Sequence, residues 1–117
     1  MTNMHRAEDR QRLMLTCCYQ AVREHFSHIA IRDIIEPPHG LFDALLARQC
    51  AVTLMRDEFN VPRRRIATML ERQRTTISFA MQAVTSRRDC AVFNIAYERM
   101  AHRAREIFNR ETRKVAA

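Results

Sequence analysis

The stretch that decides the fold is PRRRIATMLERQRTTISFAMQAVTSRR, residues 62–88. Apolar residues recur in it at the three- and four-residue spacing of a helix, first over about 62–70 and then over about 74–86. A brief polar turn, Glu71-Arg72-Gln73, separates the two runs. Two short helices joined by a turn of this length have the geometry of a helix-turn-helix, in which the first helix braces the second. The pattern therefore predicts that motif.

The same stretch is strongly basic, with seven arginines and one acid, Glu71. Thr75 and Thr76, at the start of the second helix, are small enough to reach a phosphate or a base edge. A plain helical hairpin with solvated arginines is the alternative interpretation. The concentration of arginine beside two threonines favours contact with duplex DNA.

Working outward, the apolar pattern predicts further helices over about 5–26, 41–59 and 90–111. Residues 27–35 fit either a short helix or an extended piece, and Pro37-Pro38-His39-Gly40 then breaks the chain. We expect an all-α, compact bundle of about five helices. Its expected parts are an N-terminal helical extension, a helix-turn-helix DNA-binding unit and a C-terminal amphipathic helix packed on the same domain, over residues 1–36, 41–88 and 89–117.

Composition narrows the function classes. The 117 residues include one glycine, Gly40, so an all-β fold is disfavoured and no Gly-rich phosphate loop can be written. The formal charge is +7, and Lys114 is the only lysine among 20 basic residues. Arginine suits bidentate contacts with phosphate and guanine, although arginine-rich codon usage explains the same bias. Aromatic residues make up only 7% and tryptophan is absent, which disfavours single-stranded nucleic acid.

No pattern of metal ligands or catalytic groups is present in the sequence. The four cysteines lack CxxC spacing and are predicted to be reduced core residues: Cys17, Cys18, Cys50 and Cys90. The histidines are scattered and predicted to lie at the surface: His5, His25, His28, His39 and His102. We therefore expect no metal, no cofactor and no enzymatic activity. Without a signal peptide or a long apolar run, the expected location is cytoplasmic and nucleoid-associated, not a membrane.

Three short motifs follow one another in the middle of the chain. They are Ala47-Arg48-Gln49-Cys50-Ala51 with Leu54-Met55-Arg56, then Ile66-Ala67, then Arg72-Gln73-Arg74-Thr75-Thr76-Ile77. In this order and spacing they resemble the C-terminal duplex-DNA-binding domain of the replication initiator DnaA, of the Trp-repressor-like helix-turn-helix superfamily. The resemblance covers about residues 41–88, under half the chain, and implies a stand-alone domain without the initiator's ATPase module.

The resemblance also implies residue roles. Base contacts in the major groove fall on Gln73, Arg74, Thr75 and Thr76. Arg56 falls where the family's first helix touches the duplex. Together with the basic character of the helix predicted over about 62–70, this predicts backbone contacts from six arginines: Arg48, Arg56, Arg63, Arg64, Arg65 and Arg72.

The chain departs from the family pattern at three places. Glu71 stands where the family has glycine in the turn, and Gln73 stands where it has aspartate. Glutamine pairs with adenine whereas aspartate accepts from cytosine, so we expect a different target sequence. The family's minor-groove arginine has no counterpart near Gly40, and Arg32 is too far away to take its place.

The sequence is compatible with two functions. The first is a sequence-specific double-stranded DNA-binding protein, a small transcriptional regulator or replication-modulating factor. The second is an interaction module that docks a polymerase or regulator through its amphipathic N- and C-terminal helices, with secondary DNA affinity. The same helices are candidates for a homodimer contact, which predicts half-sites roughly 34 Å apart. Salt discriminates the two, because a binder held by phosphate contacts weakens steeply as salt rises.

Overall fold

The computed structural model describes residues 6–116 and is helical without a strand in that range. The helices are α1 (Ala7–His25), α2 (Ile31–Ile35), α3 (Phe42–Asp57), α4 (Arg63–Leu70), α5 (Arg74–Arg87) and α6 (Ala91–Ala116). The predicted all-α fold is confirmed, with six helices instead of about five because residues 31–35 form a short helix. The predicted helix start at His5 lies outside the described residues.

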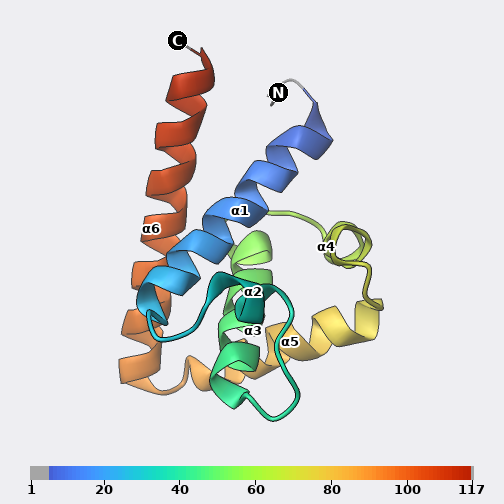
Figure 1. Cartoon of the computed structure of the whole chain (residues 1–117), viewed down its shortest axis with the longest axis vertical. Helices are drawn as coiled ribbons and strands as arrows, with labels where there is room; N and C mark the ends of the chain where they lie inside the picture. The colour runs from blue at the N-terminus through green and yellow to red at the C-terminus, as the bar shows by residue number, and fades with distance from the viewer. Residues whose placement is uncertain (1–5, 117) are drawn as a thin grey trace.

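Helix α3 lies at the centre and contacts α1, α2, α4 and α5. In Figure 1, α1 and α6 lie together on one flank, while α4 and the beginning of α5 lie on the other. Helix α5 then runs beneath α3 and leads into α6. The two helices of the basic stretch thus pack on the central helix and on each other, and α4 also meets α1, where Arg65 donates to Gln11.

The sequence of α3 explains its central place. Six consecutive residues, 50–55, are buried, and a helix that is apolar all round is one surrounded by neighbours. The one polar residue among them, Thr53, donates its hydroxyl to the Gln49 carbonyl at 2.7 Å, so its burial leaves no unsatisfied donor.

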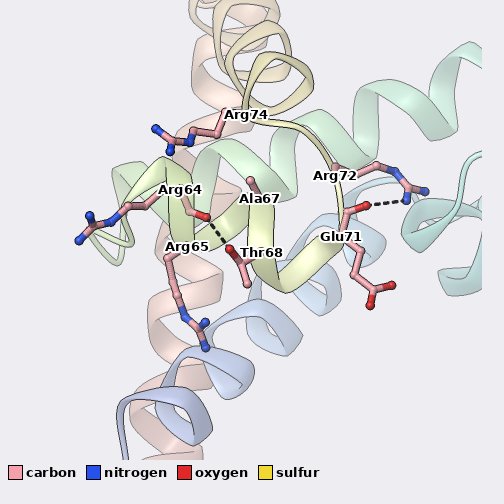
Figure 2. Close-up of a pocket in the computed structure, with 7 residues that line it drawn as sticks. All are labelled: Arg64, Arg65, Ala67, Thr68, Glu71, Arg72 and Arg74. Carbon is pink, nitrogen blue, oxygen red and sulfur yellow. Dashed lines mark hydrogen bonds between the residues drawn. The ribbon is translucent and has the colours of Figure 1, made fainter.

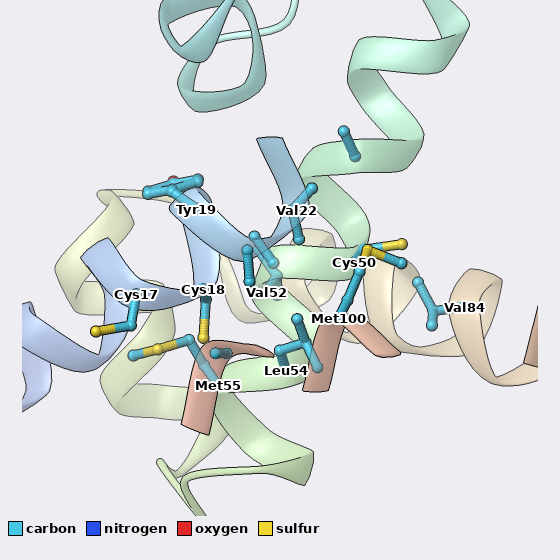
Figure 3. Packing of buried hydrophobic residues seen from close by; sticks show 14 of the residues in the cluster. Cys17, Cys18, Tyr19, Val22, Cys50, Val52, Leu54, Met55, Val84 and Met100 are labelled. Carbon is cyan, nitrogen blue, oxygen red and sulfur yellow. The ribbon is translucent and has the colours of Figure 1, made fainter. Parts of the chain in front are cut away.

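A single hydrophobic core joins all six helices. Figure 3 shows Cys17 and Cys18 of α1, Val84 of α5 and Met100 of α6 converging on α3. The segments 1–36, 41–88 and 89–117 therefore share one core where the structure describes them. Burial raises the pKa of Cys17 to about 11 and that of Cys50 to about 12, so both are neutral thiols at physiological pH.

Two details differ from the sequence predictions. Cys90 was predicted to be buried in a helix, and this is wrong: it is exposed in the link between α5 and α6. In the helix predicted over about 90–111, Val92 is among the apolar residues expected to face the core, but it is 77% exposed. The inward stripe of α6 begins instead with Phe93 and Tyr97, and Val92 lies on a neighbouring face of the helix.

Candidate nucleic-acid interface

The turn between α4 and α5 has a defined geometry. Glu71 adopts a left-handed conformation with φ 53°. Its N–H donates to the Thr68 carbonyl at 3.2 Å, and the Arg72 N–H donates to the Ala67 carbonyl at 3.0 Å. This pair of bonds is a Schellman motif, which closes a helix and usually places glycine at the left-handed position. Glu71 therefore occupies the left-handed position of this turn without being glycine.

The rotation of α5 is fixed by its buried stripe. Ile77, Ala80, Met81 and Val84 are buried, as the spacing predicted, and α5 packs with them against α3 and α4. The two helices and the three-residue turn thus lie where the sequence placed them. Their use as a DNA-binding helix-turn-helix stays a prediction.

All four predicted base-contacting residues are exposed together at the beginning of α5. Gln73 has extended backbone angles (φ −71°, ψ 150°) and precedes the helix; Arg74, Thr75 and Thr76 form its first turn. No side chain caps this end, so the first N–H groups of α5 remain available to an anion. Within residues 6–116 the Arg74 guanidinium makes no ion pair or hydrogen bond.

Three of the six predicted backbone-contacting arginines lie on surfaces beside this helix start. Arg64 is exposed, and its guanidinium, like that of Arg74, has no hydrogen-bond or ion-pair partner among the described residues, although its carbonyl accepts from the Thr68 hydroxyl. Arg63 donates from Nη1 to the Ser78 Oγ of α5 at 3.0 Å. Arg56 lies 2.9 Å (Nε to Oδ1) from Asp57 and lines a surface hollow of about 310 Å³ together with Arg63 and residues of α5.

The other three arginines contact the N-terminal segment of the chain. Arg48 donates to the Ile35 carbonyl at the end of α2. Arg65 donates from Nε to the Gln11 Oε1 at 2.7 Å, and Arg72 lies 3.1 Å (Nη2 to Oε1) from Glu36. These contacts hold α3, α4 and the turn against α1 and α2. Sequence reasoning missed them because the partners are 13, 54 and 36 residues away.

A second, larger hollow of about 580 Å³ opens over the outer face of α4. Four arginines line it, and Glu71 is its only acid: Arg64, Arg65, Arg72 and Arg74. Figure 2 shows Arg64 and Arg74 extending to one side of the turn and Arg72 to the other, toward the segment that carries Glu36. The guanidinium groups of Arg64 and Arg74, which have no carboxylate partner, suit anionic oxygens such as those of a phosphate chain.

A polar network behind Arg56 also escaped the sequence analysis. The Tyr97 hydroxyl of α6 donates to the Asp57 Oδ2 at 2.8 Å. Burial and the neighbouring Asp57 carboxylate raise the pKa of Tyr97 far above its ordinary value, so it stays a donor. Arg88 lies over the Tyr97 ring, 4.6 Å from its centroid, and 3.7 Å (Nη1 to Oδ2) from Asp57. The network fastens the ends of α3 and α5 to α6 and so holds the helix that carries Arg56.

Comparison of the chain with models of protein families, with curated proteins and with solved structures gave no match. The resemblance to the DnaA domain therefore stays a prediction. Among residues 6–116, no helix combines the length and apolar character needed to cross a bilayer. No cluster of three or more metal-ligating side chains occurs in that part of the chain either.

Proposed function

We propose that this chain is a sequence-specific double-stranded DNA-binding protein, a small transcriptional regulator or replication-modulating factor that inserts the start of α5 into the major groove. One observation carries the proposal. Four consecutive polar residues, 73–76, are exposed at an uncapped helix start that packs on α3 and α4, and Arg63 and Arg64 beside this helix lack acidic partners among the described residues.

The chemistry of these residues suits the major groove, which is wide enough for an α-helix. Arg74 has the planar fork that pairs with guanine O6 and N7, and Gln73 has the amide that pairs with adenine N6 and N7. The methyl groups of Thr75 and Thr76 fit against a thymine methyl, and their hydroxyls reach a phosphate. The exposed, uncapped first turn of α5 adds backbone N–H donors that can contact the phosphates of the DNA.

The flanking arginines supply the contacts that do not depend on sequence. Arg63 and Arg64 lie at the start of α4, and Arg56 lies near the end of α3. Each phosphate that such a cation neutralises releases condensed counterions, which strengthens binding at low salt. In this division of labour α5 selects the sequence, whereas α3 and α4 hold the duplex in place.

The packing of the terminal helices favours DNA over a docking module built on those helices. The apolar stripe of α1, with Cys18 and Val22, is buried in the core, and so is the stripe of α6, with Met100, Ala104 and Ile107. The two helices pack against each other. The inward faces of both helices are therefore occupied within the chain, while Val92 and Ile95 of α6 are exposed.

Selection from a random duplex library, followed by fluorescence anisotropy, tests the proposal. We expect an enriched motif that binds about 10³-fold or more tightly than a random duplex near 150 mM salt. Affinity for both duplexes should fall by orders of magnitude between about 50 and 200 mM salt. An absence of enrichment, or affinity that is indifferent to salt, would overturn the proposal.

A further inference from the structure

The outward face of α5 carries a stripe of exposed residues that continues beyond the first turn. Thr75, Phe79, Gln82 and Ser86 follow one another at i, i+4, i+7 and i+11, which places them on one face of the helix. The stripe lies opposite the buried residues of α5. Its most unusual member is Phe79, whose side chain is 73% exposed.

The fold of the chain gives Phe79 no role. The packing of α5 is supplied by Ile77, Ala80, Met81 and Val84, all on the other face. No aromatic neighbour or cation–π partner of Phe79 occurs among the described residues. Phe79 thus leaves apolar surface in water on the face of α5 that carries Thr75 and Gln82, and a ligand that covers this face would bury it.

The surroundings of this stripe are basic. Ser78, next to Phe79, accepts the hydrogen bond from Arg63. Gln82 lines the hollow of about 310 Å³ that Arg56 and Arg63 also line. A second copy of the chain placed on Phe79 would bring two sets of these arginines together, and like charges across an interface oppose association. The charge therefore favours a polyanion as the occupant.

We propose that Phe79 and Gln82 are further specificity-determining residues, with Phe79 packed on the 5-methyl group of a thymine and Gln82 paired with an adenine in the major groove. The inference rests on the proposed function and deepens it. Among the four bases only thymine presents a methyl group in this groove, and phenylalanine is one of the side chains that contact it. Glutamine binds adenine through N6 and N7.

Helix geometry sets the spacing of these contacts. Each residue advances an α-helix by about 1.5 Å, so Phe79 lies roughly 6 Å beyond Thr75 along the axis. Base pairs are spaced by about 3.4 Å, so this distance corresponds to roughly two base pairs when α5 lies along the groove. The target site should therefore contain A·T pairs about two positions from the pair that Arg74 and Thr75 contact.

A thymine-to-deoxyuridine scan of the selected duplex tests the role of Phe79, because deoxyuridine lacks only the methyl group. We expect replacement at one thymine to weaken the wild-type chain about three- to fivefold, as for loss of one buried methyl group. At the thymine about two base pairs from the pair facing Thr75, the Phe79→Ala variant should bind the thymine and deoxyuridine duplexes equally, whereas any loss at a thymine facing Thr75 or Thr76 should persist. Phe42→Ala is the matched control, because Phe42 is 78% exposed on α3, and it should keep the wild-type sensitivity.

Adenine replaced by 7-deazaadenine, which lacks the N7 acceptor, tests Gln82 in the same way. The wild-type chain should bind one such duplex less tightly, whereas Gln82→Ala should not distinguish it from the parent. Unchanged circular dichroism and melting temperature in Phe79→Ala and Gln82→Ala would show that these exposed substitutions leave the fold intact.

The inference would be overturned if the wild-type chain ignored every deoxyuridine, or if Phe79→Ala stayed as sensitive as the wild type. It would also be overturned if sedimentation showed that Phe79→Ala dissociates a dimer while methyl sensitivity persists. These results differ from failure of the proposed function, in which the wild-type chain would show no preference for the selected duplex over a random one.

Discussion

Arginine is used in two different ways on the two sides of α3. On the side of α1 and α6, Arg103 lies 2.8 Å (Nε to Oε1) from Glu24, and Arg105 lies 3.1 Å (Nε to Oε1) from Glu58. On the side of α4 and α5, Arg64 and Arg74 have no carboxylate partner among the described residues. The arginine charge is thus partly neutralised by these acids on one side, whereas that of Arg64 and Arg74 is left open on the other.

The paired arginines join helices together. Arg105 also donates to the Glu58 carbonyl at 2.5 Å and lies 4.6 Å from the Phe59 ring centroid, so it fastens α6 to the end of α3. Arg103 joins α6 to α1 in the same manner. A high arginine content therefore does not by itself mark a binding surface. A binding surface is better indicated where arginines without acidic partners gather at an exposed helix start, as Arg64 and Arg74 do, because they stay available to phosphate.

Reversing the charge of two arginines should produce the largest change in DNA affinity. The change should differ strongly between the α4–α5 side and the α1–α6 side. We expect Arg64→Glu with Arg74→Glu to weaken binding to the selected duplex by more than about 100-fold near 100 mM salt, since two contacts of about 1–3 kcal/mol each are lost. Arg99→Glu with Arg113→Glu changes the net charge equally, at two exposed sites on α6. This control should bind within about threefold of the wild type. Equal losses in anisotropy titrations would mean that only total charge matters.

On the α4–α5 side, single alanine substitutions should distinguish residues that contact bases from residues that contact the DNA phosphates. Arg74→Ala should cost about 1–3 kcal/mol on the selected duplex and little on random DNA. Arg64→Ala should weaken every duplex similarly and reduce the slope of log affinity against log salt by about one. The same titrations measure both quantities. Equal losses on selected and random DNA for both variants would contradict the division of labour.

Breaking the contact between Glu36 and Arg72 should raise DNA affinity, by less than the arginine substitutions lower it. Glu36→Gln removes the carboxylate that holds Arg72, so the guanidinium becomes available to a phosphate. We expect binding to selected and random duplexes to tighten by about two- to fivefold, the range of an exposed ion pair. Glu98→Gln, which removes the partner of Arg88, makes the same change in charge away from the turn. An equal gain in both variants would refute a specific role for Glu36.

The smallest change in DNA affinity should follow from breaking the ion pair between Arg103 and Glu24, which joins α6 to α1. Arg103→Gln should leave DNA affinity within about twofold and slightly lower the stability of the fold. The hydrogen bonds from Arg103 lower the pKa of Glu24. The pair therefore contributes fully above the ordinary pKa of glutamate, and its contribution is lost as the pH falls through the lowered value. Urea midpoints of wild type and variant should differ at pH 7 and converge near pH 3, and a constant difference would contradict this assignment.

The helices could be predicted because their signals are local. The buried positions of α5, from Ile77 to Val84, follow the 3.6-residue period, and Pro62 directly precedes α4. The short helix α2 could not be decided because five residues carry too little of any period. Cys90 was misplaced because an apolar neighbourhood in sequence does not show where one helix ends and the next begins.

The candidate site was predictable in part. The exposure of residues 73–76 follows from the same period that buries Ile77. The contacts of Arg65 with Gln11 and of Arg72 with Glu36 depend on how helices distant in sequence pack together, so no local sequence pattern predicts them. Phe79 had a usable signal, since it lies four residues after Thr75. Its exposure is not evident from the sequence, because a phenylalanine in an amphipathic helix is ordinarily assigned to the core.

Amide chemical-shift perturbation on the 13.8 kDa chain tests the central claim most directly. On titration with the selected duplex, we expect the largest shifts at residues 73–79, with smaller ones around Arg56 and Arg63. The outer faces of α1 and α6 should stay unperturbed. Shifts confined to α1 and α6, with the start of α5 unchanged, would contradict the assignment of α5 as the DNA-reading helix.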